Sequence, residues 1–396
     1  MLAPTKLSLS GERFSVVYHI VGNHEEVMRK AEDICVEQTI EFPADLVPDD
    51  DIRSSIIGRI EEVEACDNNT FRVRISYAVE IVQGELTQFL NVIFGNISLK
   101  PGIRVQDLHL PEALLRDYRG PRFGISGVRS LVGVSDRPLL CTAIKPMGLS
   151  VAELSRQTYE FALGGVDIIK DDHGLTDQSF APYRERVSRC VESVQKANQQ
   201  SGRVSLYAPN VTAPGDQLFE RAYFAKQAGA GALLVSPGIV GFDRMQALAD
   251  DDRIALPLLY HPTFLGSFVT SPLNGISHRV IFGLIGRLAG ADIVIFPNFG
   301  GRFSFSREEC LSIAQAACEP MAHLRPIFPA PAGGMKIERI AEMIETYGND
   351  VILLIGGDLH RHPQGLQKAS QLFRESVLQG RRYSWQSDYL AQMIQQ

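Results

Sequence analysis

The sequence predicts an α/β protein in which a ferredoxin-like α+β domain (residues 1–125) precedes a (β/α)8 barrel (residues 126–396) with a helical C-terminal tail. The main observation is that short apolar runs alternate with helical patterns roughly every 30 residues, and that eight such runs occur. A second is that no G-x-G-x-x-G pattern follows the first run. This absence disfavours the alternative, an open doubly wound sheet.

The N-terminal elements are predicted in the order β-α-β-β-α-β, which is typical of a ferredoxin-like sandwich. Phe14–Ile20 is a strand-like run, and Asn23 can cap the helix that follows it. Residues 57–82 contain two runs around the turn sequence DNNT, which indicates a hairpin. The helical stretch ELTQFLNVIF and the short strand VQDLHL complete the domain.

The barrel strands are predicted from the eight apolar runs. Helical stretches lie between them, and several of these close with glycine. The runs cover residues 138–146, 166–172, 204–210, 232–238, 256–262, 292–298, 325–334 and 351–358.

Composition and charge are those of an ordinary globular protein. Hydrophobic residues make up 45% of the chain, and 39 basic against 46 acidic side chains give a net charge of −7. This balance excludes disordered and collagen-like chains and argues against nucleic acid as a partner. The 6 cysteines form no C-x-x-C pair, and neither a signal peptide nor a membrane-length apolar run is present. We therefore expect a reduced, cytoplasmic protein that does not bind membranes.

Polar residues follow several of the predicted strands. The C-terminal strand ends are where a barrel gathers its reactive groups. Lys145 follows the first strand, the sequence KDDH (residues 170–173) ends the second, and His261 ends the fifth. Asn210 and Asn298 end the third and sixth strands, whereas glycine pairs end the last two: Gly333, Gly334, Gly356 and Gly357.

Each of these signals has a structural alternative. Lys170 and Asp172 should point to the same side of their strand, where they could bind a divalent cation if the lysine carried a carbamate, or form a buried ion pair. The glycine amides could bind a phosphate or simply form tight turns. His261, Asn210 and Asn298 are as compatible with a structural role as with a functional one.

Five stretches together resemble the large-subunit RuBisCO superfamily. They are GGVDIIKDDH (164–173), TAIKPMGLS (142–150), FGN (94–96), LLYHP (258–262) and PAGG (331–334). Their order and spacing agree with that family along essentially the whole chain. The resemblance implies at least a homodimer, in which the N-terminal domain of one subunit completes the active site in its partner's barrel.

The resemblance also implies roles for single residues. Lys170 matches the lysine that family members carbamylate to bind one Mg²⁺ per site, and Asp172 matches the next metal ligand. Lys145 matches a proton-transfer lysine, and His261 matches the histidine after the fifth strand. The matched substrate-binding positions are Glu37 and Asn96 in the N-terminal domain, together with the phosphate-binding glycines Gly333, Gly334, Gly356 and Gly357.

The chain departs from the CO2-fixing members at several positions. His173 replaces a glutamate ligand, Met147 replaces a second lysine, and Arg302 takes the place of the loop lysine that CO2 fixation needs. Pro262 and Ala332 replace the arginine and serine that hold a second phosphate. The resemblance therefore implies a RuBisCO-like protein (form IV) that binds a monophosphate and does not fix CO2.

Members of that group share one step, the formation of a metal-stabilised enolate from a phosphorylated sugar-like substrate. Because His173 departs from the KDDE sequence of enolase-type members, we expect decarboxylation or C–C cleavage of a 3-oxo sugar-acid monophosphate (3-oxo-isoapionate phosphate type), with Mg²⁺ as cofactor and His173 as a possible third ligand. One alternative is an enolase or isomerase of methylthio-pentose phosphates in methionine salvage. The other is a non-catalytic regulatory member in which His173 has abolished metal binding.

Overall fold

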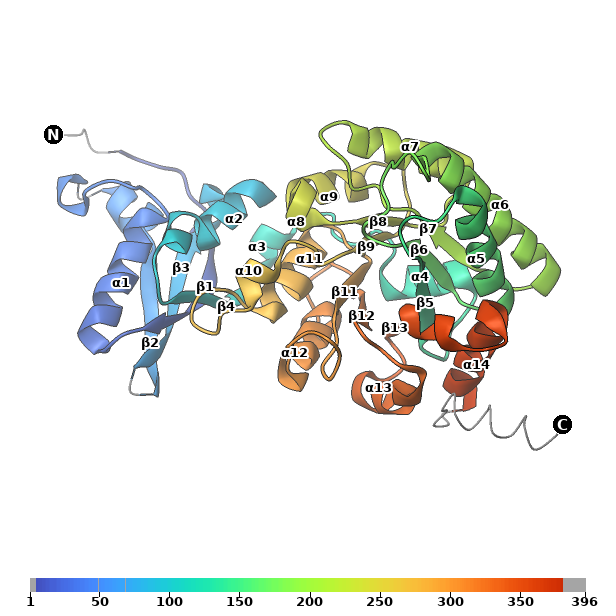
Figure 1. Cartoon of the computed structure of the whole chain (residues 1–396). Coiled ribbons are helices and arrows are strands. Elements are labelled where there is room, and N and C mark those ends of the chain that lie inside the picture. Colours follow the sequence, from blue (N-terminus) through green and yellow to red (C-terminus); the bar gives the residue numbers. More distant parts are fainter. Residues whose placement is uncertain (1–4, 49, 68, 380–396) are drawn as a thin grey trace.

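The computed structural model describes residues 5–48, 50–67 and 69–379, and shows a small N-terminal sheet domain beside a larger barrel (Figure 1). Asn68, in the middle of the predicted DNNT turn, and the predicted tail beyond residue 379 lie outside the described residues. The predicted boundary at residue 125 stays a prediction. In the described part of the chain, no helix combines the length and apolarity needed to cross a membrane.

The N-terminal sheet has the predicted ferredoxin-like arrangement. Its strand order is β4-β1-β3-β2, and β1 pairs antiparallel with both β3 and β4. The Asn23 side chain accepts a hydrogen bond from the Glu26 backbone amide, and the Glu26 carboxylate accepts one from the Asn23 backbone amide. This capping box starts α1 where predicted. The elements are β1 (Arg13–Val21), α1 (His24–Glu37), β2 (Arg59–Asp67), β3 (Thr70–Ala78), α2 (Leu86–Phe94) and β4 (Ile103–His109).

All eight predicted barrel strands are present, and they pair in parallel in the orders β12-β11-β9-β8 and β13-β5-β6-β7. A bridge between Asn210 and Leu234 joins β7 to β8, and β12 lies beside β13, which closes the barrel. The strands are β5 (Leu139–Ile144), β6 (Ile168–Asp171), β7 (Leu206–Ala208), β8 (Leu233–Val235), β9 (Leu258–Tyr260), β11 (Ile293–Pro297), β12 (Phe328–Ala332) and β13 (Ile352–Leu354).

Helices surround the barrel, and α4 begins close to the predicted domain boundary. The helical stretch between the fifth and sixth predicted strands, SHRVIFGLIGRL, contains a π-helix (Arg279–Leu284) followed by a short α-helix. The helices are α3 (Glu112–Leu115), α4 (Gly124–Val132), α5 (Val151–Gly164), α6 (Tyr183–Ser201), α7 (Gln217–Ala228), α8 (Pro237–Val240), α9 (Phe242–Asp250), α10 (Gly266–Val269), α11 (Ile285–Leu288), α12 (Arg307–Cys318), α13 (Ile340–Tyr347) and α14 (Gly365–Gln379). Shorter helical turns are Ala44–Leu46, Ile52–Ile56, Val79–Ile81, Asn96–Leu99, Ile337–Arg339 and Gly357–Arg361.

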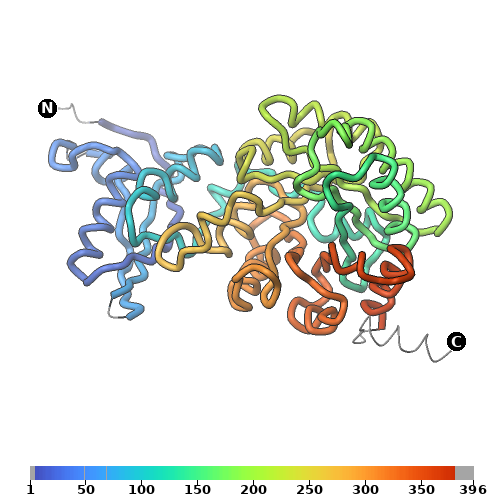
Figure 2. Tube along the Cα trace, viewed as in Figure 1, coloured from blue at the N-terminus to red at the C-terminus, as the bar shows by residue number. Residues whose placement is uncertain are grey.

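One connection was not predicted. The segment after β9 leaves the barrel and adds a short strand, β10 (Gly275–Ile276), to the edge of the N-terminal sheet, parallel to β4 (Figure 2). The Ser277 amide then donates to the Val105 carbonyl at 2.8 Å. The same segment also lines a cavity at the C-terminal ends of the barrel strands. It therefore connects the N-terminal sheet to one side of that cavity.

Candidate active site

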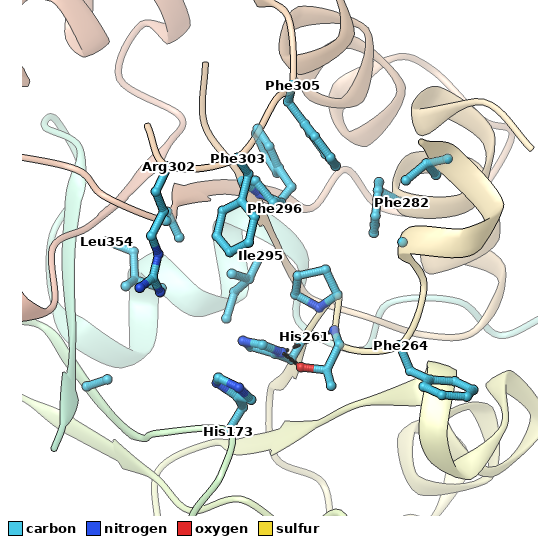
Figure 3. A pocket seen from close by; sticks show the side chains of 18 of the residues that line it. His173, His261, Phe264, Phe282, Ile295, Phe296, Arg302, Phe303, Phe305 and Leu354 are labelled. Carbon is cyan, nitrogen blue, oxygen red and sulfur yellow. Dashed lines mark hydrogen bonds between the residues drawn. The ribbon is translucent and has the colours of Figure 1, made fainter. Parts of the chain in front are cut away.

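A cavity of about 570 Å³ opens at the C-terminal ends of the barrel strands (Figure 3). Its polar lining comes from the ends of β5, β6 and β9 and from the loops that follow β9 and β11, and the rest is mostly apolar. This position matches the expected place for barrel chemistry. The predicted residues that line the cavity are Lys145, Lys170, Asp172, His173, His261, Arg302 and Gly333.

Lys170 lies near the end of β6 and is 3% exposed. Its Nζ donates to the Asp171 carbonyl at 3.0 Å. Burial lowers the pKa of the Lys170 ammonium. A larger neutral fraction favours reaction with CO2, because only the free amine can form a carbamate.

Asp171, which the sequence reasoning did not single out, turns away from the cavity and anchors β6. Its carboxylate accepts from the Tyr207 hydroxyl at 2.6 Å, from the Asn210 amide at 3.0 Å and from Arg186 Nη2 at 3.2 Å. Arg186 and Asp171 are both fully buried. Because of this network, Lys170 and Asp172 on either side of Asp171 both face the cavity, as strand alternation predicts.

Asp172 pairs with Lys145 rather than with Lys170. Its Oδ1 lies 3.3 Å from Lys145 Nζ and 3.6 Å from His173 Nδ1. The alternative of a Lys170–Asp172 ion pair is therefore wrong. Burial opposes ionisation of Asp172, but the contact with His173 and the charge of Lys145 outweigh it and hold the pKa of Asp172 well below its usual value.

The imidazole rings of His173 and His261 stack, with ring centroids 4.6 Å apart and an interplanar angle of 15°. Figure 3 shows the two rings face to face on one side of the cavity. His261 Nδ1 lies 2.6 Å from Thr263 Oγ1. Burial and the nearby charge of Lys170 lower the pKa of His261 well below its usual value, so its ring is neutral.

The donor set for a divalent cation depends on Lys170. Among residues 5–48, 50–67 and 69–379, no three His, Cys, Asp or Glu side chains are grouped so that they could hold a metal ion. A carbamate on Lys170 would add an oxygen donor beside the Asp172 carboxylate, with the His173 nitrogen as a softer third donor. The residues therefore fit Mg²⁺ only with the carbamate in place.

The predicted phosphate turns leave their amides available. Within the described part of the chain, the amides of Gly333, Gly334, Gly356 and Gly357 donate no hydrogen bond. A Cβ on Gly356 would lie 3.5 Å from Lys145 Nζ, so the second turn adjoins the lysine. Gly333 lines the cavity, whereas Gly334, Gly356 and Gly357 do not.

Arg302 lies in the loop after β11, and its side chain extends toward Leu354 and the cavity (Figure 3). Its guanidinium lies 5.3 Å from the centre of the Phe303 ring, and no ion pair among the described residues includes it, so its charge remains available to a ligand. With Lys145 it makes this part of the cavity suitable for an anion.

Several predicted residues lie outside the cavity. Glu37 and Asn96 hydrogen bond to each other at 3.0 Å in the N-terminal domain. Asn298 is buried and accepts from the Tyr347 hydroxyl at 2.6 Å, which is a structural role. Asn210 donates to the carbonyl of His173 at 2.9 Å and so holds the loop that presents that histidine.

The sequence reasoning missed an aromatic wall in this cavity. It is defined by five phenylalanines that line the cavity: Phe264, Phe282, Phe296, Phe303 and Phe305. They come from the segment after β9, the π-helix, β11 and the loop after β11. Pro262 and Ala332 also line this cavity, so two of the predicted departures lie among apolar side chains. The only sequence signal was the F-x-F pattern at residues 303–305.

The chain is similar to known proteins over most of its length. The family model described as "Ribulose bisphosphate carboxylase large chain, catalytic domain" matches residues 124–383. The chain is 37% identical to a 5-methylthioribulose-1-phosphate isomerase of Rhodospirillum rubrum, over 92% of this chain and 96% of that protein. It is 33% identical to a 2,3-diketo-5-methylthiopentyl-1-phosphate enolase of Geobacillus kaustophilus, over 92% of each chain. Its fold matches the crystal structure of a Rubisco-like protein from Rhodopseudomonas palustris with a TM-score of 0.84 and 37% identity, covering 94% of this chain and 99% of that chain.

Proposed function

The chain belongs to the ribulose bisphosphate carboxylase large-chain family and to its RuBisCO-like (form IV) members, and on this premise we propose that it enolises or isomerises a ketose monophosphate with an apolar tail. The substrate class is that of the methylthio-pentose phosphates named for two relatives. The decarboxylation of a 3-oxo sugar-acid monophosphate, expected from the sequence, becomes the second candidate.

The observation that carries this proposal is the contrast between the two ends of the cavity. One end offers Lys145, Arg302 and the glycine turns, which suit a single phosphate. The other end carries Phe264 and Phe282 of the aromatic wall, whereas Phe303 lies beside Arg302, with its ring centre 5.3 Å from the guanidinium (Figure 3). The arginine and serine that would hold a second anion are replaced by Pro262 and Ala332. A thioether or alkyl tail gains from burial there, whereas a second phosphate or a carboxylate loses hydration without a partner.

The lysines and histidines supply the chemistry at the polar end. Mg²⁺ held by carbamylated Lys170 and Asp172, with His173 as a third donor, would polarise the substrate carbonyl when bound. Lys145 Nζ lies 3.3 Å from the Asp172 carboxylate. With Asp172 engaged by the metal, the neutral amine of Lys145 would take the proton from the carbon next to that carbonyl, and the resulting ammonium would return it to a neighbouring atom. Neutral His261 orients the substrate oxygens by a hydrogen bond.

The N-terminal residues act in a partner subunit. Glu37 and Asn96 are paired with each other and do not line the cavity of their own chain. In a homodimer with shared sites, each N-terminal domain would bring this pair to the partner's barrel. Sedimentation velocity at micromolar concentration tests this assembly, and a fully active monomer would contradict it.

The second candidate rests on His173. His173 stands where enolase-type members carry a glutamate, and loss of CO2 from a 3-oxo acid yields an enolate without an initial proton abstraction. The aromatic wall argues against it, because it offers no charge for the departing carboxylate.

The two candidates are separated by their products. The purified protein, with Mg²⁺ and bicarbonate, is incubated with methylthioribulose 1-phosphate, with 2,3-diketo-5-methylthiopentyl 1-phosphate and with 3-oxo-isoapionate phosphate, and the products are followed by ³¹P NMR and CO2 release. We expect turnover of a methylthio substrate without CO2. Turnover of the 3-oxo acid alone, with CO2 release, would overturn the proposal in favour of decarboxylation.

A further inference from the structure

The loop after β11 (residues 299–305, here called the β11 loop) carries Arg302 over the cavity and is fastened from one side by Arg339 at the start of α13. Arg339 Nη1 donates to the Phe299 carbonyl at 2.8 Å, and the guanidinium lies 5.1 Å from the centre of the Phe299 ring. Arg339 Nε and Nη2 donate to both carboxylate oxygens of Glu342 at 2.8 and 3.0 Å. The bidentate pair fixes the orientation of the guanidinium, which then holds the first residue of the loop.

The other side of the loop rests on the glycine turn after β12. The Arg302 amide donates to the Gly333 carbonyl at 3.0 Å. Two glycines allow this close packing: a Cβ on Gly300 (φ +65°) would lie 2.8 Å from Arg339 Nη1, and a Cβ on Gly301 would lie 2.4 Å from the Gly333 carbonyl oxygen. The loop is thus held between Arg339 and the phosphate turn.

We infer that Arg339 is a positioning residue that fastens the base of the β11 loop, so that Arg302 is a preorganised anion-binding group at the cavity. The inference rests on the proposed function only in that Arg302 receives the substrate's anionic group. The Arg302 guanidinium is then already oriented when the anion binds. The entropy cost of ordering this side chain is therefore not subtracted from the binding free energy.

Limited proteolysis tests the fastening without any substrate. Trypsin cuts after arginine, and cleavage of the Arg302–Phe303 bond reports opening of the loop. We expect Arg339→Gln to speed this cut roughly tenfold, because a charge-assisted contact is lost. Arg307→Gln is the matched control: its guanidinium lies 5.9 Å from the same Phe299 ring but gives the loop no hydrogen bond within the described residues. Cleavage followed by mass spectrometry at equal rates in the wild type and both variants would overturn the inference.

Binding of inorganic phosphate tests the consequence for Arg302. We expect Arg339→Gln to weaken phosphate binding, measured by calorimetry, by roughly tenfold, and Arg339→Lys to recover part of it because an ammonium can still reach the Phe299 carbonyl. Arg307→Gln should leave it unchanged. Equal phosphate affinity in Arg339→Gln and the wild type would contradict preorganisation, whatever substrate the enzyme uses.

A double mutant separates the fastening from a general loss of stability. Gly300→Ala disturbs the same contact from the loop side, because its Cβ would meet Arg339 Nη1. If both changes act through one contact, the double variant should be cut no faster than the faster single variant. Fully additive effects would overturn the inference, and Gly300→Ala alone supplies the test if Arg339→Gln does not fold.

Discussion

The two ends of the cavity are built by different kinds of residue and from different parts of the fold. The polar end is formed by side chains at the ends of β5, β6 and β9 together with Arg302 from the β11 loop. The buried Asp171–Arg186 pair and the barrel hydrogen bonds hold the strand ends in place. The aromatic wall is formed mainly by connecting segments, one of which is tied to the N-terminal sheet through β10. We therefore propose that the strand ends carry the reaction, while the connecting segments contribute most to the selection of the substrate.

The largest effect is expected at the polar end. Lys170→Ala removes the amine that would carry the carbamate, and we expect turnover to fall by at least about 10³-fold. The fold should persist, because Lys170 makes only one side-chain hydrogen bond within the described residues. Steady-state kinetics and circular dichroism check this, and a variant with substantial turnover would remove Lys170 from the chemistry.

Removal of metal and CO2 should lower activity, which depends on the polar end, and leave the stability of the fold nearly unchanged. In EDTA and CO2-free buffer we expect activity to fall at least about 100-fold, and addition of Mg²⁺ with bicarbonate to restore it. The melting temperature should change little, because the aromatic wall and the barrel core do not depend on the ion. Full activity under these conditions would rule out the carbamate and metal requirement.

The aromatic wall is tested by Phe264→Ser. Phe264 lines the cavity and is 76% exposed in the subunit, so its replacement should leave the fold intact. We expect KM for a methylthio-pentose monophosphate to rise roughly tenfold with little change in kcat, since one apolar contact is lost. Phe180→Ser is the control, because Phe180 is also an exposed phenylalanine (42%) but does not line the cavity. An unchanged KM in Phe264→Ser would place the substrate tail elsewhere.

Acid should lower the free energy of unfolding, because a histidine packed against the aromatic wall resists protonation. His278 packs edge-on against Phe305 with ring centroids 4.3 Å apart, its Nδ1 lies 3.4 Å from Glu309 Oε1, and Arg104 lies close enough to oppose its protonation. Burial lowers the pKa of His278 to about 4. The unfolded chain, with a histidine pKa near 6.5, therefore binds a proton more readily than the folded one between about pH 6.5 and about pH 4.

The consequence is a loss of stability as the pH falls through that window, by up to about 3 kcal/mol from this one residue. Urea unfolding measured at several pH values checks the slope. In His278→Phe the slope should flatten, and an unchanged slope would show that other groups cause the acid sensitivity.

The same comparison explains what could be predicted from the sequence. The eight strands and the polar residues after them could be predicted because alternation and strand length determine where Lys145, Lys170 and Asp172 point. The aromatic wall could not, because Phe282 and Phe296 occur in apolar runs that look the same whether they face a core or a cavity. The β10 strand is two residues long and pairs with a strand about 170 positions earlier, a contact that no local pattern encodes.

Two polar residues at strand ends turn away from the cavity because they bind buried partners. Asn298 follows a strand as a cavity residue would, but its side chain turns to Tyr347 and the sulfur of Met343. Asp171, between two cavity residues, instead anchors the barrel. In both cases the side chain's direction is decided by buried partners that are distant in sequence.

The proposed function requires that one end of the cavity binds a phosphate and the other an apolar tail. Solvent deuterium exchange measures it most directly: methylthioribulose 1-phosphate and ribulose 1,5-bisphosphate are incubated separately with the enzyme, Mg²⁺ and bicarbonate in D2O, and deuterium uptake next to the carbonyl is followed by NMR. The account predicts exchange into the methylthio compound with a kcat/KM at least about 100-fold higher than for the bisphosphate. Equal or faster exchange into the bisphosphate would contradict it.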